Sequence, residues 1–298
     1  MREFKIAAIG LDTSHTVEFA KLLQGPDTPD DLRIKGLKIV NAMRFPSAFQ
    51  PEEGQDKRQQ QLEALGVKMQ PNIEKAAAGM DGILLELNDP GMHLEYFEKI
   101  LQYKLPVFLD KPLADNYANG KKIFDLAQSN NIRVWSGSSL RFMAELAEAK
   151  LEVGAADLCY VFGALGKAAR GSDVIWYGIH GAEMLNEIMG NGARSVFARA
   201  DERGVVAVIQ YGEGRRGVLE LNRGGGYGGR IQRGKTMRQF MLGHEGKPIY
   251  WHLLVRIAAF FLDGVQPVDI ESMLEVQQIL DAIEKSLADG AEITLVRD

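Results

Sequence analysis

The chain has 298 residues, of which 46% are hydrophobic and 25% charged, and its formal net charge is −5. This composition is typical of a globular protein long enough for two domains of about 150 residues each. The negative charge argues against nucleic-acid binding, and the single cysteine excludes an intrachain disulfide and a cysteine-based metal cluster. No apolar run reaches the roughly 18 residues of a membrane helix, and no secretory leader pattern stands at the N-terminus, so we expect a cytoplasmic protein.

Strand-like and helix-like segments alternate over the first 137 residues. Short continuous apolar runs predict strands buried on both faces, and apolar residues at helical spacing predict the helices between them. The expected strands are 4–10, 36–45, 81–88, 105–112 and 132–139, and the expected helices are 13–23, 57–66, 93–103 and 117–131. This alternation predicts a Rossmann-like, doubly wound parallel sheet, and we assign residues 1–137 to a dinucleotide-binding domain of an α/β protein.

The second half has a different pattern. Strand-like runs separated by glycine-rich turns are typical of antiparallel meanders. The expected strands are 157–165, 193–202, 204–212, 216–224 and 237–243, and the expected helices are 141–153, 178–189, 249–264 and 270–290. We therefore assign residues 138–298 to a C-terminal α+β domain built on a largely antiparallel sheet. Its basic stretch, 215–238, is interpreted as a solvated hairpin, with attraction of an anionic substrate as the alternative.

The first turn raises the main question about function. Gly10 allows a sharp turn between a buried strand and a helix whose free N–H groups favour a phosphate. A dinucleotide fingerprint has further glycines where this chain has Asp12 and His15. Asp12, Thr13 and Ser14 are good N-caps, and a capping side chain would occupy those N–H groups. The turn is either an altered cofactor site or a self-capped helix without a phosphate.

Other candidate residues follow the later strands. Arg44 stands near the end of the second strand, where no acid is present to hold a ribose, and it is either an NADP-selecting residue or a surface arginine. Lys111 stands at the carboxyl end of a strand and could act as a general acid or base. His180 stands near the start of an expected helix with Glu183 one turn later, and it could share proton transfer with Lys111. We expect no metal, and a site made of His15, His93 and Asp12 is the alternative.

Several segments, in order, resemble the Gfo/Idh/MocA oxidoreductase family over nearly the whole chain. They are the Gly10 turn, "GILLELNDPGMHLEYFEKILQYKLPVFLDKPLAD", "SLRF", the Gly-x-His helix at 178–180 and a final helix after "FLDGVQP". The resemblance implies a dehydrogenase of sugars or polyols that uses NAD or NADP, with a Rossmann domain and a second domain whose open sheet forms homo-oligomers. It implies a small-molecule substrate and neither a nucleic-acid nor a membrane partner.

The resemblance also implies roles for individual residues. Lys111 matches the catalytic lysine that orients substrate and relays a proton, in a segment with a cis Lys111–Pro112 bond, and His180 matches the active-site histidine. The remaining matches are Glu183 for the acid after that histidine, Asn88 and Asp89 for the loop beside the cofactor, His93 for the histidine that follows this loop, and Gly10 for the first fingerprint glycine.

Three departures from the family pattern leave the function open. Asp12 and His15 replace glycines, and Trp176 stands where the family has an aspartate, with Asp173 three residues out of register. Our leading prediction is an NAD(P)-dependent oxidoreductase acting on a sugar-like, polyol-like or related hydroxyl-bearing molecule. The alternative is a catalytically silent nucleotide- or metabolite-binding protein, and a third reading is a lyase or hydrolase that uses Lys111 and His180 without nicotinamide.

Overall fold

The computed structural model describes residues 3–243 and 246–296 of the chain, which divide into two compact units. The first unit runs to Gly137 and includes Gly246–Asp269, whereas the second runs from Ser138 to the 240s and resumes at Ile270. The sequence-based division places all of 138–298 in the second domain. This is wrong for residues 246–269, which belong to the first unit. Across the described residues, every helix is too short or too polar to traverse a lipid bilayer.

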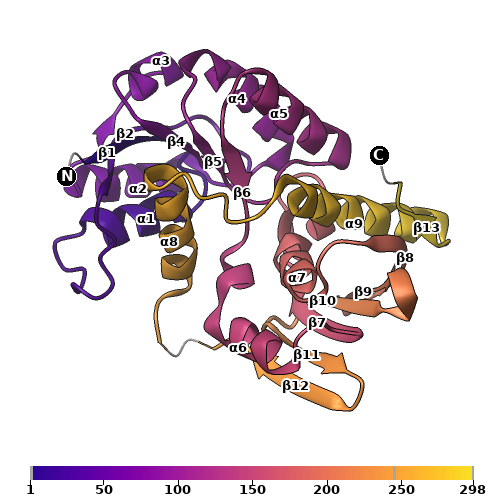
Figure 1. The fold of residues 1–298 in the computed structure, drawn as a ribbon. Coiled ribbons are helices and arrows are strands. Elements are labelled where there is room, and N and C mark those ends of the chain that lie inside the picture. The colour runs from indigo at the N-terminus through magenta and orange to yellow at the C-terminus, as the bar shows by residue number, and fades with distance from the viewer. Residues whose placement is uncertain (1–2, 244–245, 297–298) are drawn as a thin grey trace. The chain divides into compact units, whose positions relative to one another are not determined.

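The first unit contains a six-stranded, all-parallel sheet in the order β3-β2-β1-β4-β5-β6 (Figure 1). Its strands are β1 (Phe4–Ile9), β2 (Leu37–Met43), β3 (Lys68–Met69), β4 (Gly82–Leu85), β5 (Val107–Leu109) and β6 (Val134–Ser136). Its helices are α1 (His15–Gln24), α2 (Glu52–Ala64), α3 (Ile73–Ala77), α4 (His93–Ile100), α5 (Tyr117–Ser129) and α8 (Ile249–Leu262). This order confirms the Rossmann-like prediction, and ligands of such sheets bind at the carboxyl ends of the strands where the order reverses, here β1 and β4.

Gly10 makes the close approach of β1 and β4 possible. Its φ of +116° lies in a region that residues with a side chain rarely adopt. A Cβ atom at this position would overlap the carbonyl oxygen of Glu86, directly after β4. The turn after β1 therefore requires glycine for reasons of backbone geometry, whatever ligand lies beside it.

Aromatic packing explains why α8 belongs to the first unit. The ring of Phe261 stacks on Phe4 with centroids 5.3 Å apart, and Phe260 lies 6.1 Å from Trp135. Arg133 donates a hydrogen bond of 2.7 Å to the Phe260 carbonyl oxygen. The apolar periodicity of 249–264 predicts the helix correctly, but periodicity does not indicate which core the helix covers.

The second unit contains a seven-stranded mixed sheet in the order β12-β11-β7-β10-β9-β8-β13. Its strands are β7 (Leu158–Ala164), β8 (Ala193–Asp201), β9 (Gly204–Tyr211), β10 (Arg216–Asn222), β11 (Gly228–Arg233), β12 (Thr236–Met241) and β13 (Ile293–Thr294), and its helices are α6 (Ala144–Val153), α7 (Asp173–Met189) and α9 (Ile270–Asp289). The largely antiparallel sheet is confirmed, with one parallel pair, β7 and β10. Strand β11, within the basic stretch, and the two-residue strand β13 were not predicted.

Helix α7 carries the candidate histidine of the second unit. Ser172 caps its N-terminus by accepting a hydrogen bond of 3.1 Å from the Ile175 amide, and Gly190, at a φ of +67°, ends it. Its apolar side packs against β7 and β10, where Leu219 and Leu221 are fully buried. The helix is therefore fixed along its length, and so is the position of His180 within the unit.

Candidate functional site

The Asp12 carboxylate joins three chain segments at the carboxyl ends of β1, β2 and β4. Its Oδ2 accepts a hydrogen bond of 2.6 Å from the Ser47 hydroxyl, and its Oδ1 accepts one of 3.0 Å from the Asn88 amide. The Asn88 side chain donates in return to the Asp12 carbonyl oxygen at 3.2 Å. Burial raises the pKa of Asp12, and the bonds from Ser47 and Asn88 oppose that shift. Asp12 thus connects the turn after β1 to the loops after β2 and β4 through hydrogen bonds.

The prediction that Asp12, Thr13 or Ser14 caps the first helix holds only for Thr13. Its hydroxyl oxygen accepts from the His15 amide at 3.3 Å, and Ser14, at the N-cap position, makes no side-chain cap bond. The helix, expected from residue 13, begins at His15. The amides of Thr16 and Val17 are therefore not taken by Asp12 or Ser14. Free N–H groups at a helix N-terminus are a common binding place for phosphate, so the prediction of an altered cofactor site at this turn stays open.

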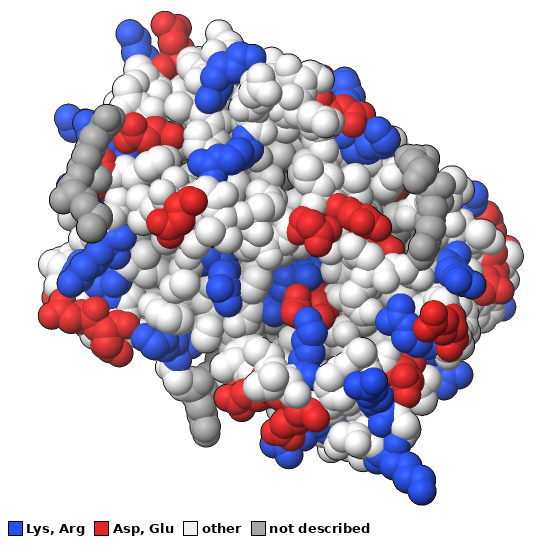
Figure 2. Space-filling view, viewed as in Figure 1, with Lys and Arg blue, Asp and Glu red and all other residues white. Residues whose placement is uncertain are grey.

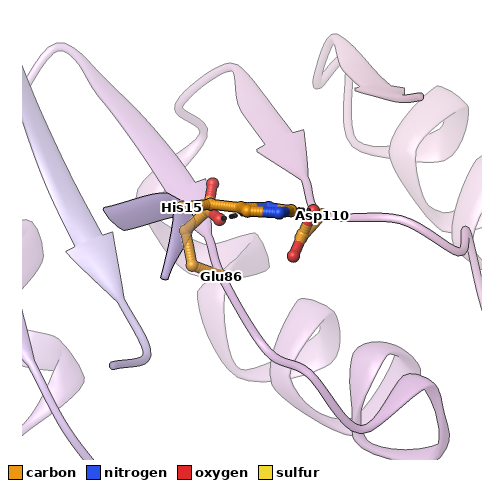
Figure 3. Close-up of side chains that lie close together, drawn as sticks. All are labelled: His15, Glu86 and Asp110. Atoms are coloured by element: carbon orange, nitrogen blue, oxygen red, sulfur yellow. Dashed lines mark hydrogen bonds and ion pairs between the residues drawn. The ribbon is translucent and has the colours of Figure 1, made fainter. Parts of the chain in front are cut away.

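His15 turns inward onto two acids, as Figure 3 shows. Its Nδ1 lies 2.9 Å from the Asp110 Oδ1 and 3.8 Å from the Glu86 Oε2, and the Tyr250 ring covers it at 4.9 Å. Burial opposes ionisation of Asp110, but His15 and Lys111 outweigh it and lower its pKa to about 2. Burial, and then the charge of Asp110, raise the pKa of Glu86. Sequence reasoning missed Glu86, although an acid within the run "GILLELN" was a visible signal.

Lys111 lies at the carboxyl end of β5, as expected, and its side chain is largely buried. The Lys111–Pro112 peptide bond is cis, in agreement with the resemblance. The Lys111 amide donates a hydrogen bond of 2.8 Å to the Asp110 Oδ1, and its ammonium group acts electrostatically on both Glu86 and Asp110. Lys111 therefore lies just after the strand next to β4, close to the place where the strand order of the sheet reverses.

The loop after β4 is fixed by its own side chains. The Asp89 Oδ1 accepts a hydrogen bond of 2.9 Å from the Gly91 amide. The two ring nitrogens of His93 lie 2.7 Å from the Leu87 carbonyl oxygen and 3.2 Å from the Leu113 carbonyl oxygen. His93 thus ties the loop after β4 to the loop after β5. Because carbonyl oxygens occupy both ring nitrogens, His93 is a positioning residue and not a metal ligand.

Arg44 is engaged by two acids of α2. Its guanidinium forms an ion pair with Asp56 and lies 3.5 Å from a carboxylate oxygen of Glu52. A 2′-phosphate at this place would compete with these two carboxylates. These two ion pairs favour the interpretation of Arg44 as a surface arginine over its interpretation as an NADP-selecting residue.

In the second unit, His180 lies within a group of aromatic rings. The Ser138 hydroxyl and the His180 Nδ1 are 2.7 Å apart. Tyr177 and Tyr227 meet the imidazole edge-on at 5.1 and 6.0 Å, and Trp176 lies 5.1 Å from Tyr177. Trp176 precedes His180 by four residues on α7, so the two share a helix face. Ser138 and the two tyrosines orient the imidazole.

Glu183 is buried and forms an ion pair with Arg141 of the "SLRF" segment. The same guanidinium donates to the Asn186 Oδ1 at 2.6 Å and pairs with Glu187 at 3.0 Å. Burial raises the pKa of Glu183, and the charge of Arg141 opposes that shift. This network anchors the segment that carries Ser138, a role for Arg141 that sequence reasoning did not identify.

Asp173 is likewise occupied within its unit. Its Oδ1 accepts a hydrogen bond of 2.8 Å from the Ala168 amide, and its Oδ2 pairs with Arg223 at 3.1 Å. Its role as a stand-in for the aspartate replaced by Trp176 stays a prediction. So does a common site for Lys111 and His180, since one belongs to the first unit and the other to the second.

The basic stretch 215–238 forms β10, β11 and β12 rather than a single hairpin. Besides the Arg223–Asp173 pair, Arg238 lies 3.2 Å from a carboxylate oxygen of Glu152. On the face drawn in Figure 2, blue and red residues are interspersed rather than gathered by sign. This distribution agrees with a solvated charged surface more than with a basic patch that attracts anions.

Residues 51–138 match the model of the Gfo/Idh/MocA family, described as an oxidoreductase family with an NAD-binding Rossmann fold. Solved structures with the same fold include a probable dehydrogenase from Thermotoga maritima, with 18% identity, 98% of this chain and 99% of that chain covered and a TM-score of 0.78. GenD2 from gentamicin A biosynthesis, crystallised with NAD, has 14% identity, coverage of 100% and 97%, and a TM-score of 0.80.

A third similar structure is scyllo-inositol dehydrogenase from Lactobacillus casei with bound NAD(H) and scyllo-inositol, at 15% identity, 98% and 99% coverage and a TM-score of 0.78. No curated protein sequence matches the chain. The fold is thus shared with these solved structures over nearly the whole chain, with a Rossmann unit followed by a mixed-sheet unit. The family match and the whole-chain likeness in fold confirm the resemblance to the Gfo/Idh/MocA oxidoreductases, and the family's NAD-binding description agrees with the cofactor class expected from the sequence.

Proposed function

We propose that this protein is an NAD(P)-dependent oxidoreductase that acts on a hydroxyl-bearing small molecule. The position of Lys111 carries the proposal, because a largely buried ammonium group lies at the carboxyl end of β5 in a sheet with Rossmann strand order. The match to an NAD-binding oxidoreductase family supports the same reaction class.

The residues that would hold the dinucleotide surround the Gly10 turn. The first-turn amides of α1 would contact the pyrophosphate, and the loop of Asn88 and Asp89 would border the nicotinamide half. The bound nicotinamide would accept a hydride from the carbinol carbon of the substrate. Asp12 adds a negative charge to this place, so we expect weaker binding than in a relative with glycine there.

Two side chains of this chain would act on the substrate itself. Lys111 would donate a hydrogen bond to the substrate oxygen and orient it. His180 would take the hydroxyl proton on its imidazole, whose ring Ser138 orients. Glu183, through Arg141, would position the segment that bears Ser138.

The ring of Trp176 suggests which substrates fit. An aspartate would accept hydrogen bonds from substrate hydroxyls, whereas tryptophan offers one N–H donor and a large apolar face. Trp176 and Tyr177 provide such a face on α7 next to His180. We therefore propose a substrate smaller or flatter than a free sugar, able to stack on an aromatic surface.

A panel of alcohols tests the proposed function. We expect little or no hydride transfer from glucose, myo-inositol or scyllo-inositol, and measurable reduction of NAD⁺ or NADP⁺ by at least one smaller or aromatic alcohol. Absorbance of the reduced nicotinamide is the readout, and an inositol dehydrogenase serves as positive control. Rapid oxidation of glucose or inositol would show that the family's aspartate is dispensable here and would overturn the role given to Trp176.

A second candidate is a binding protein without catalysis, which Asp12 and His15 favour because both replace fingerprint glycines. Binding of a dinucleotide or another metabolite with no turnover across the panel would support this candidate. The non-redox lyase or hydrolase has no further observation in its favour.

We also propose that the protein forms a homo-oligomer through the sheet of the second unit. One side of this sheet exposes apolar residues, among them Val206 at 44% and Met241 at 63%. Exposed apolar residues on an open sheet face are compatible with a protein interface. Light scattering of the purified protein would give the assembly state.

A further inference from the structure

His15, Glu86 and Asp110, here called the His15 cluster, come together from three segments. His15 is the first residue of α1, Glu86 follows β4 and Asp110 follows β5. One ligand atom from each lies within 4.8 Å of the others, and Figure 3 shows the three side chains pointing toward one another. The two acids have no exposed surface, and His15 has 8%.

Three oxygen atoms of the His15 cluster accept no hydrogen bond from any described residue. They are both carboxylate oxygens of Glu86 and the Oδ2 of Asp110. A buried carboxylate without hydrogen-bond donors is costly, and within the described part of the chain Glu86 is such a group, whereas Asp110 has donors at its Oδ1 only. Elsewhere this chain pairs its buried acids, since Asp12 binds Ser47 and Asn88, and Glu183 binds Arg141.

The geometry points to a divalent transition-metal ion, Zn²⁺ or Mn²⁺, bound by the Nδ1 of His15 and the carboxylates of Glu86 and Asp110. Ligand atoms of a tetrahedral zinc site, with bonds of about 2.0–2.1 Å, lie roughly 3.3 Å apart. The Nδ1 of His15 is 2.9 Å and 3.8 Å from the two carboxylate oxygens, which brackets this spacing. Two carboxylates balance the charge of a divalent ion, and the Lys111 ammonium group, which acts on both acids, adds one further positive charge.

The ligand types narrow the choice of ion. Mg²⁺ and Ca²⁺ prefer sites made only of oxygen atoms. An imidazole nitrogen beside two carboxylates suits first-row transition metals and zinc. Bound there, the ion would connect α1 with the ends of β4 and β5 and would supply a partner for the Glu86 carboxylate, whose oxygens accept no hydrogen bond from the described residues. Sequence reasoning considered a different set, with His93 and Asp12, whose polar atoms are already engaged.

Metal titration of the tag-free protein tests this site without any dinucleotide, so its outcome is separate from that of the proposed function. The protein is stripped with a chelator, and Zn²⁺, Mn²⁺ and Mg²⁺ are then added in calorimetric and thermal-unfolding titrations. We expect about one Zn²⁺ or Mn²⁺ per chain, a raised unfolding temperature and no comparable response to Mg²⁺. Metal analysis of the protein as purified gives the occupancy before stripping.

Variants assign the binding to the cluster. Glu86→Gln and His15→Gln should each weaken metal affinity at least about 100-fold, whereas Glu95→Gln, on the exposed face of α4, should bind as the wild type does. Two variants are used so that His15→Gln decides if Glu86→Gln fails to fold. No binding by the wild type, with the two acids sharing a proton instead, would overturn the inference, as would unchanged affinity in a folded cluster variant.

Discussion

Lys111→Ala is expected to lower kcat/KM by about 10²- to 10³-fold, the usual loss when one donor to a reacting oxygen is removed. The reason is the position of this buried lysine just after β5, at the edge of the sheet where ligands of such folds bind. The rate is measured with the best alcohol from the panel, and circular dichroism checks that the variant folds.

The matched control for this variant is Lys122→Ala. Lys122 lies on α5 and forms an exposed ion pair with Glu98 at 2.8 Å, so its loss should leave the rate unchanged. Lys111→Arg keeps the charge but changes the donor geometry and should recover only part of the rate. A folded Lys111→Ala variant that turns over at the wild-type rate would remove Lys111 from the proposed chemistry.

Arg141→Ala should destabilise the second unit by about 3–5 kcal/mol, because it leaves a buried carboxylate without its partner. The guanidinium contacts Glu183, Asn186 and Glu187, and the Glu183 side chain is only 4% exposed. Urea unfolding measures the change. The exposed pair of Lys121 and Asp125 provides the control, where Lys121→Ala should cost at most about 1 kcal/mol.

A double variant separates the buried pair from general packing. Replacing Arg141 by Met and Glu183 by Leu removes both charges and should recover most of the stability lost in Arg141→Ala. If Arg141→Ala costs less than about 1 kcal/mol, the pair is not the anchor of the "SLRF" segment, and the positioning of Ser138 has another cause.

Local patterns in the sequence predicted most of the elements but not all of their pairings. Buried apolar runs gave five strands of the parallel sheet but not the two-residue strand β3, and apolar periodicity gave α8 and α9 nearly to the residue. Strand β11 was missed because its glycines and arginines resemble a loop. The parallel pairing of β7 with β10 and the packing of α8 on the first unit both depend on contacts distant in sequence, which local patterns do not encode.

In the candidate site, too, local patterns predicted the positions of single residues but not the contacts between residues distant in sequence. The positions of Gly10 and Lys111 at strand ends came from local pattern and family resemblance. Asp12 is a good N-cap by residue type, yet its carboxylate is held by Ser47 and by Asn88, which lies 76 residues away. The gathering of His15 with Glu86 and Asp110 likewise depends on how the strands are ordered, so the sequence alone gave no reason to group them.

Calorimetric titration with NAD⁺, NADH, NADP⁺ and NADPH tests the central claim most directly, with the wild type and Asp12→Asn side by side. The wild type should bind at least one dinucleotide, and at 100 times its dissociation constant that ligand should add about 2.7 kcal/mol of stability. Asparagine preserves the shape of Asp12 but removes its charge. A carboxylate ~5 Å from a phosphate costs about 1–3 kcal/mol at an effective dielectric constant between 20 and 80, so the variant should bind about tenfold to hundredfold more tightly. Absence of binding by both proteins at millimolar dinucleotide would contradict the proposed oxidoreductase.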